Sequence, residues 1–260
     1  MGRSDTSQQG THMVARARTA ANVRRQQTPT RLRLLDGFSL EIDGRAVDLP
    51  HGTQRLLAFL ALRPHALGRV FMAGSLWLDA SDDRAAANLR SALWRLGHRG
   101  GPIIIRAHGT LRLDPDVWVD VREATELARR WLGGHATDED AAASALLGAE
   151  LLPDWYDEWV ADERERFRQL RLHALEAMAE RLIETGHVGD ALLAALAATT
   201  DDPLRESAHR ALIKVHLAEG NIGEAMRVLR RCEALFEREL GMRPSTQLTE
   251  LIPHAAAGIG

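Results

Sequence analysis

The chain has 260 residues, of which 45% are hydrophobic and 27% charged, and its formal net charge is -3. This length suffices for two globular domains of ordinary composition. No apolar run reaches the roughly 18 residues that span a bilayer, and no apolar signal-peptide core lies near the N-terminus, so we expect a cytoplasmic protein without a membrane partner.

The charge is distributed unevenly along the chain. Residues 1–116 contain 17 Arg and 10 acidic residues, a balance of +7, whereas residues 117–260 contain 16 basic and 26 acidic residues, a balance of -10. A basic half attracts phosphate groups, and an acidic half is better suited to a protein partner. Residues 1–30 lack periodicity and are rich in Ser, Thr, Gln and Arg, which predicts a disordered basic tail.

Short segments of alternating polarity follow the tail. Arg31–Leu35 and Phe38–Ile42 alternate, and the Asp43–Gly44 turn signal leads into Val47–Leu49. Alternating segments joined by a strong turn signal are typical of neighbouring strands. They predict a small antiparallel sheet.

Three helices and a strand pair are predicted next. Apolar residues at helical spacing predict helices over Thr53–Leu62, over Arg69–Leu78, and from a cap at Asp82 or Asp83 to about Arg99, where Gly100–Gly101 ends the helix. The strand pair is Ile103–Arg106 and Leu111–Leu113. A sheet, three helices and a hairpin in this order predict an α+β winged helix-turn-helix domain over residues 31–116.

Residues 117–254 have an almost wholly helical pattern and predict a second, all-α domain. Its first predicted helices are Asp120–Leu132, Asp138–Leu152 and Trp159–Thr185, with shorter paired helices after them. Gly186, Gly189 and Ala191 recur 34 residues later as Gly220, Gly223 and Ala225. This is the period of tetratricopeptide repeats, in which Gly closes the first helix and Ala lets the second pack closely.

The helix that begins near Arg84 has two distinct faces, because successive residues advance by about 100° around the axis. One face is an apolar stripe of Ala85, Leu89, Ala92, Leu93 and Leu96. The residues on or beside the other face are Arg84, Asn88, Arg90, Ser91, Trp94, Arg95 and His98. In a winged helix this face enters the major groove, where Arg pairs with guanine and Asn with adenine. We predict a DNA-contacting face; a merely solvated face is the alternative.

The predicted hairpin and two helix starts supply further candidate DNA contacts. Arg106, His108 and Thr110 lie at or near the hairpin tip, where a wing usually enters the minor groove, although His108 alternatively serves only the turn. Thr53, Gln54 and Arg55 open the first helix, whose exposed amides suit a phosphate. Arg69, before the second helix, is a similar candidate.

Signals for an enzyme are poor. No glycine loop precedes Lys214, and the 11 His show no zinc-binding spacing, so we expect no cofactor and no metal. An acidic cluster surrounds aromatic residues at the start of a predicted long helix. Because acidic side chains stabilise the positive end of a helix dipole, we interpret the cluster as a helix start rather than as a site of general acid–base chemistry. Its members are Asp154, Asp157, Glu158, Asp162 and Glu163. The single Cys232 lies among apolar residues at helical spacing, which predicts a buried core residue.

Several segments resemble one known family in their order and spacing. In the first half they are Gly37–Ile42 with Gly44, Gln54–Arg55, Gly68–Val70 with Leu76–Trp77, Ala87–Leu96 and Leu111–Asp114. In the second half they are Asp120–Val121, the acidic and aromatic segment through Trp159 and Glu163 to Leu170, the repeat pair and Glu239–Pro244. Together they make the chain similar, over about residues 31–252, to the Streptomyces antibiotic regulatory proteins and their relatives with a bacterial transcriptional activation domain.

The resemblance implies a nucleoid-associated transcriptional activator. An OmpR-type winged helix would bind direct repeats in double-stranded promoter DNA, and a tetratricopeptide-like helical domain would support a homodimer on DNA and recruit RNA polymerase. A secondary-metabolite gene cluster is the implied target. The chain has Gly97–His98 where the family often has Arg-Arg, so a phosphate anchor there is weaker. The alternative is an interaction scaffold whose winged helix contacts protein.

Overall fold

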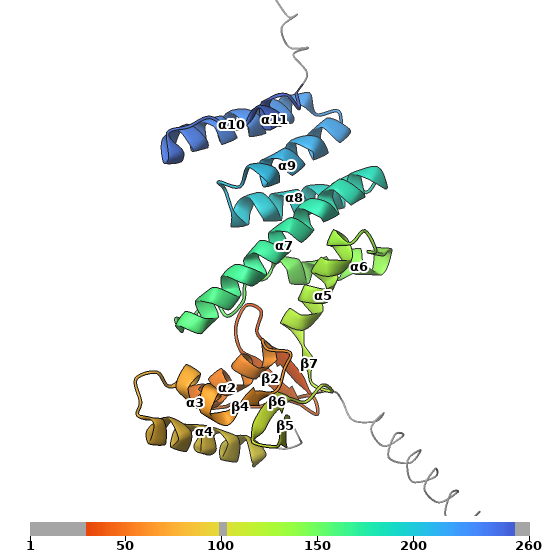
Figure 1. The fold of residues 1–260 in the computed structure, drawn as a ribbon. Coiled ribbons are helices and arrows are strands. Elements are labelled where there is room, and N and C mark those ends of the chain that lie inside the picture. The colour runs from red at the N-terminus through yellow and green to blue at the C-terminus, as the bar shows by residue number, and fades with distance from the viewer. Residues whose placement is uncertain (1–29, 99–102, 253–260) are drawn as a thin grey trace, which may run out of the picture. The chain divides into compact units, whose positions relative to one another are not determined.

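The computed structural model describes residues 30–98 and 103–252. They divide into two compact units: the first holds the chain up to Leu34 and Phe38–Val119, and the second holds Leu35–Gly37 and the chain from Asp120 onward. Except for Thr30, the predicted tail lies outside the described residues, as does the predicted helix stop at Gly100–Gly101. Figure 1 colours the elements of each unit along the chain.

A four-stranded sheet of order β3-β2-β1-β7 lies in the first unit. Its strands are β1 (Arg31–Arg33), β2 (Ser39–Ile42), β3 (Arg45–Ala46) and β7 (Trp118–Val119). The first three pair antiparallel as predicted, but β7, which the sequence did not predict, pairs parallel to β1. The third strand begins earlier than predicted, because Asp43 and Gly44 both have positive φ and form a two-residue turn that leaves Arg45 directly opposite Ile42.

Three helices of the first unit enclose its core. They are α2 (His51–Ala61), α3 (Arg69–Leu76) and α4 (Asp82–Gly97). Leu56, Leu60, Met72 and Leu76 are fully buried, and α4 packs against both other helices. The predicted cap of α4 at Asp82 or Asp83 is wrong by one or two residues. Ser81 is the N-cap. The carboxylates of Asp82 and Asp83 lie in the first turn, where they stabilise the helix by interacting with the positive end of its dipole.

A second sheet, of order β4-β6-β5, completes the first unit. Strands β5 (Ile104–Ala107) and β6 (Thr110–Leu113) form the predicted hairpin. Strand β4 (Leu67–Gly68), immediately before α3, pairs antiparallel with β6 and was not predicted, because two residues carry no periodicity. The start of α3 is therefore held beside the hairpin.

The second unit consists almost entirely of helices. The elements are α5 (Asp120–Leu132), α6 (Asp138–Ala142), the 3-10 helix η1 (Ser144–Gly148), α7 (Glu158–Glu184), α8 (Val188–Asp201), α9 (Glu206–Ala218), α10 (Ile222–Leu240) and α11 (Thr246–Thr249). The prediction of one helix over Asp138–Leu152 is wrong. The α-helix ends at Ala142, and the Ser144 hydroxyl donates a hydrogen bond to the Ala141 carbonyl at 2.6 Å, which competes with continued α-helical bonding.

Successive helices of the second unit pack side by side, with α7 against α5, α8 and α9, and α9 against α10 (Figure 1). Gly186 and Gly220, at the two copies of the 34-residue period, have φ of 81° and 75° and follow the ends of α7 and α9. This left-handed conformation favours Gly. Ala191 and Ala225, the matching positions of the following helices, are both completely buried.

The connection between β1 and β2 packs within the second unit. The buried Asp120 carboxylate accepts hydrogen bonds from the Leu35 and Val121 amides, at 3.0 Å and 2.7 Å. The Asp36 amide donates to the Glu150 carbonyl at 2.7 Å, and the Glu150 amide donates to Asp36 Oδ1 at 3.0 Å. These bonds satisfy the backbone amides of a connection whose sequence pattern indicates only an ordinary loop.

Candidate nucleic-acid interface

Helix α4 presents a polar face that its buried stripe holds in place. Ala85, Leu89, Ala92, Leu93 and Leu96 are all buried, as their spacing predicts. Of the predicted contact residues on α4 and at its C-cap, Arg84, Arg90, Ser91, Trp94, Arg95 and His98 are exposed, and Asn88 is half-buried. The helix therefore cannot turn about its axis without exposing its Leu side chains.

The guanidinium groups of this face are available to an external anion. Among the described residues, Arg84, Arg90 and Arg95 form no ion pair with an acidic side chain. Arg90, Ser91, Trp94 and Arg95 together line an open hollow of about 480 Å³ on the outer side of α4. Unpaired exposed cations around a hollow attract phosphate and the electronegative edges of guanine.

Trp94 and His98 form a stacked pair at the C-terminal end of α4. Their ring centroids are 4.1 Å apart and the rings are tilted by 43°. The His98 Nδ1–H donates to the Trp94 carbonyl at 2.8 Å, which fixes the imidazole against the indole. The Trp94 side chain remains 64% exposed, so the pair covers one side of the indole and leaves most of it accessible.

The β5–β6 hairpin lies against α4 through one of the predicted DNA-contacting residues. The Arg106 Nη2 donates to the Leu93 carbonyl at 3.1 Å. No pattern in the sequence indicates this bond, because it joins a helix carbonyl to a strand residue 13 positions later in the chain. Arg106 therefore positions the hairpin relative to α4, in addition to its predicted DNA role.

The hairpin turn is formed by His108 and Gly109, with φ of 48° and 77°. Two consecutive positive values match the two-residue turn that follows the twist of the flanking strands. The Thr110 hydroxyl donates to the Ala107 carbonyl at 2.6 Å. His108 is thus a turn residue whose exposed ring is also placed at the hairpin tip.

The other predicted phosphate contacts have different surroundings. Helix α2 begins at His51 rather than at Thr53, and the amides of Thr53 and Gln54 donate to the Pro50 carbonyl, so the expectation of exposed amides at Thr53 and Gln54 is wrong. The Gln54 side chain donates to the Leu49 carbonyl at 2.8 Å, and Arg55 is half-buried. Arg69 is exposed, and its amide donates to the Gly109 carbonyl at 3.3 Å, which places it beside the hairpin turn.

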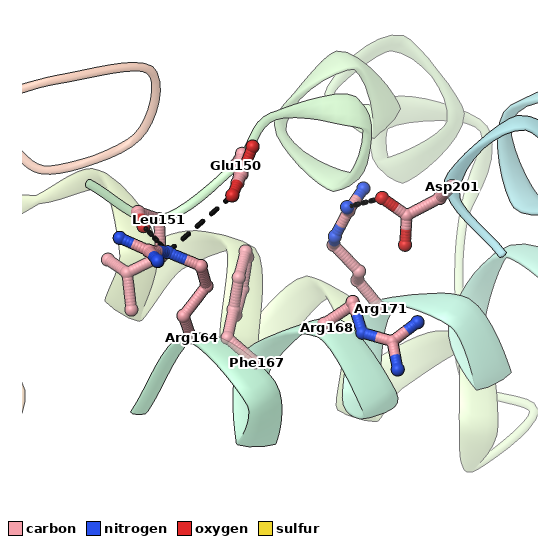
Figure 2. A pocket seen from close by; sticks show the side chains of 7 residues that line it. All are labelled: Glu150, Leu151, Arg164, Phe167, Arg168, Arg171 and Asp201. Carbon is pink, nitrogen blue, oxygen red and sulfur yellow. Dashed lines mark hydrogen bonds and ion pairs between the residues drawn. The ribbon is translucent and has the colours of Figure 1, made fainter. Parts of the chain in front are cut away.

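A second concave feature lined by several cationic side chains is a cavity of about 240 Å³ in the second unit (Figure 2). It is lined by Glu150, Leu151, Arg164, Phe167, Arg168, Arg171 and Asp201. The three Arg side chains come from successive turns of α7, so they share one face of that helix.

These three Arg side chains are used within the chain. Arg164 Nε donates to the Leu151 carbonyl at 2.9 Å, and the buried Arg171 donates to the Leu147 carbonyl at 3.1 Å and pairs with Asp201. Arg168 binds Glu165 and Asp202, and hydrogen bonds from Arg168 and Gln169 lower the pKa of Glu165 to about 2. The bonds of Arg171 to Leu147 and Asp201 thus hold α7 against η1 and α8.

The residues weighed as enzyme candidates take structural positions. Asp157 is the N-cap residue of α7 and Glu158 lies in its first turn. Lys214 pairs with Glu180 at 2.6 Å. Cys232 is fully buried, and this burial raises the pKa of its thiol to about 11. Within residues 30–98 and 103–252, no group of three or more His, Cys, Asp or Glu side chains has a metal-binding arrangement, and no helix is both long and apolar enough to cross a membrane.

Comparison with known proteins identifies the class. Residues 118–254 match the family described as the bacterial transcriptional activator domain, and this match spans more than half of the chain. The chain therefore belongs to that family, which confirms the predicted resemblance.

Two relatives extend the likeness into the first unit. The chain is 29% identical over 225 residues to the regulatory protein AfsR of Streptomyces coelicolor, which covers 80% of this chain and 22% of AfsR. It also resembles the structure of Mycobacterium tuberculosis EmbR in complex with a low affinity phosphopeptide, with a TM-score of 0.64 and 25% identity over 86% of this chain and 64% of the EmbR chain. The chain thus spans about a fifth of AfsR and less than two thirds of the EmbR chain.

Proposed function

We propose that this chain is a transcriptional activator, not an enzyme, whose first unit binds double-stranded promoter DNA. In this proposal the outward face of α4 enters the major groove and the β5–β6 hairpin contacts the neighbouring minor groove, as in an OmpR-type winged helix. The observation that carries it is the set of exposed Arg90 and Arg95 side chains, without acidic partners among the described residues, on a helix whose opposite face is buried. Membership of the activator family supports the same conclusion.

The predicted contacts divide into two groups by their surroundings. The first group consists of exposed residues for which no side-chain hydrogen bond within the described residues is seen, so that they are free to reach bases or phosphates; they are Arg84, Arg90, Ser91, Trp94, Arg95 and His108, with Arg69 beside the hairpin turn. Gln54, His98, Arg106 and Thr110 each use a side-chain donor within the chain. We therefore assign contacts with bases or phosphates to the first group and a positioning role to the second.

We also propose roles for the second unit. Its excess of acidic residues suits contacts with a basic protein surface rather than with DNA, which supports recruitment of RNA polymerase. The left-handed Gly186 and Gly220, with the buried Ala191 and Ala225, support a tetratricopeptide-like arrangement of its later helices. A homodimer on direct repeats, and control of a secondary-metabolite cluster from the cytoplasm, follow from the family resemblance.

A selection experiment tests the DNA-binding proposal. The full chain is incubated at low salt with a pool of random 30-base-pair duplexes, and the bound fraction is amplified, sequenced and used for affinity measurements. We expect one motif, repeated in direct orientation, to be enriched. Arg95→Ala should lose about 1–3 kcal/mol of binding to that motif, which is the cost of one good base contact.

Arg45→Ala is the matched control, because Arg45 is exposed on β3. This strand lies at the edge of the four-stranded sheet, whereas the β5–β6 hairpin belongs to the other sheet. It should bind the selected duplex as the wild type does. The scaffold alternative is favoured by exposed apolar side chains at Val70 and Leu78, which are 86% and 71% exposed. A chain that enriches no duplex at low salt, but retains a protein complex as salt rises, would support the scaffold and contradict the activator.

A further inference from the structure

Trp94 is an unusual residue to find on a solvent-facing helix surface. Its side chain is 64% exposed, whereas Trp131 and Trp155 in the second unit are 6% and 8% exposed. Trp has the largest apolar area of the natural side chains, so leaving it in water gives up the stabilisation that burial would provide. An isolated exposed apolar residue is common and carries no conclusion by itself. The surroundings of Trp94 are what distinguish it.

The indole already packs against a neighbouring ring before any partner binds. The His98 ring stacks on it at 4.1 Å between centroids, and the His98 Nδ1–H donates to the Trp94 carbonyl at 2.8 Å. A side chain that is already immobilised loses little conformational entropy when it forms a contact. The contact with His98 therefore favours one placement of the Trp94 indole and reduces the entropy that a ligand contact would cost.

Cationic and polar side chains flank this apolar surface. Arg90 and Ser91 precede Trp94 by about one helical turn, and Arg95 follows it, so that the four side chains line one open hollow of about 480 Å³. The hollow combines hydrogen-bond donors with a single large apolar wall. A matching ligand must present hydrogen-bond acceptors and an apolar group side by side.

The major groove offers one such combination. Its floor presents acceptors at guanine and adenine N7, guanine O6 and thymine O4, and its apolar group is the C5 methyl of thymine. We propose that Trp94 is a specificity-determining residue that packs against the methyl group of one thymine while Arg90 or Arg95 binds an adjacent base edge or phosphate. This inference rests on the proposed DNA-binding function and adds a base identity to it.

The experiment removes the methyl group from the DNA and the indole from the protein, singly and together. Each thymine of the selected duplex is replaced in turn by deoxyuridine, which lacks only the C5 methyl. Burial of one methyl group contributes about 0.8 kcal/mol, so wild-type affinity should fall about fourfold at one position. Trp94→Ala should bind the thymine duplex at least fourfold more weakly, and the deoxyuridine replacement at that position should cause no further loss.

Two further variants keep the test specific. Trp94→Phe retains an apolar ring without the indole N–H, and should retain sensitivity to the methyl group. Leu78→Ala removes another exposed apolar side chain of the same unit and should behave as the wild type. Circular dichroism of each variant checks that it is folded before binding is compared.

The outcomes separate this inference from the proposed function. A folded chain that enriches no duplex contradicts DNA binding itself. A chain that binds its duplex but is insensitive to every deoxyuridine replacement contradicts only the role of Trp94. Equal methyl sensitivity in the wild type and in Trp94→Ala also contradicts it, because the methyl group would then be contacted by another residue.

Discussion

Replacement of Leu93 by Ala tests how α4 is oriented. Leu93 is 3% exposed and lies at the centre of the stripe that packs against α2 and α3. Truncation of a buried Leu costs about 2–5 kcal/mol, because apolar surface loses its packing partners and the surrounding side chains fill the space only partly. The Leu93 carbonyl, which binds Arg106, belongs to the backbone and is kept. We therefore expect a destabilisation of about 3 kcal/mol, confined to the first unit.

Native-state hydrogen exchange of the full chain, followed by mass spectrometry, measures this destabilisation in each unit separately. Peptides from α2 and α4 should exchange about a hundredfold faster in Leu93→Ala, while peptides from α7 should be unchanged. Arg95→Ala is the matched control on the opposite face and should change stability by less than about 0.5 kcal/mol. Equal destabilisation by the two variants, or none in Leu93→Ala, would refute the orientation of α4 on which the DNA-contacting face depends.

The remaining predictions concern the hairpin, a helix cap and the buried thiol. Arg106→Ala removes the hydrogen bond from the hairpin to α4 and should cost about 0.5–1.5 kcal/mol, read as faster exchange in β5 and β6. Asp140→Asn breaks the Asp140–Arg130 ion pair and weakens the capping box with Thr137, and should destabilise the second unit by about 1 kcal/mol at pH 7. Because Arg130 and Thr137 lower the pKa of Asp140, this difference should be full above the unfolded-state pKa of about 4 and should be lost in urea titrations as the pH falls from there through the lower pKa that Asp140 has in the folded chain. Cys232 should resist iodoacetamide at pH 8 in the native chain and react once urea unfolds it, because it is buried and its thiol pKa is about 11; rapid native labelling would contradict this packing.

The parts of the fold that a periodicity argument predicts are the long amphipathic helices. The orientation of α4 follows from residues 85, 89, 92, 93 and 96, because a period of 3.6 assigns each residue to one face. The bounds of α5 are those expected, and those of α7 differ by one residue at each end. These segments are long enough for the apolar pattern to repeat several times, so the pattern outweighs local exceptions.

The short elements could not be predicted in the same way. Strands β4 and β7 have two residues each and are defined by their partners β6 and β1, which lie far away in sequence. The expected helix over Asp138–Leu152 fails for a related reason, because Leu151 pairs with Leu35 from the distant β1–β2 connection. Such pairings override local propensity.

The same limit applies to the candidate site. Residue type and helical phase were enough to gather Arg90, Trp94 and Arg95 on one face. They were not enough to show that Gln54 and Arg106 donate hydrogen bonds to backbone carbonyls of the chain, or that His98 stacks on Trp94. Those contacts depend on tertiary geometry, and our proposal that Gln54 and Arg106 position other residues rests on them.

The salt dependence of DNA binding tests the central claim most directly. The affinity of the full chain for its selected duplex is measured between 50 and 200 mM salt, a range over which phosphate contacts weaken strongly, for the wild type and for the double variant Arg90→Ala with Arg95→Ala. We predict that the double variant remains folded, binds at least tenfold more weakly, and has a shallower slope, reduced by about 0.9 for each phosphate that the protein no longer neutralises. Unchanged affinity and slope in the folded double variant would contradict the assignment of this face of α4 to DNA.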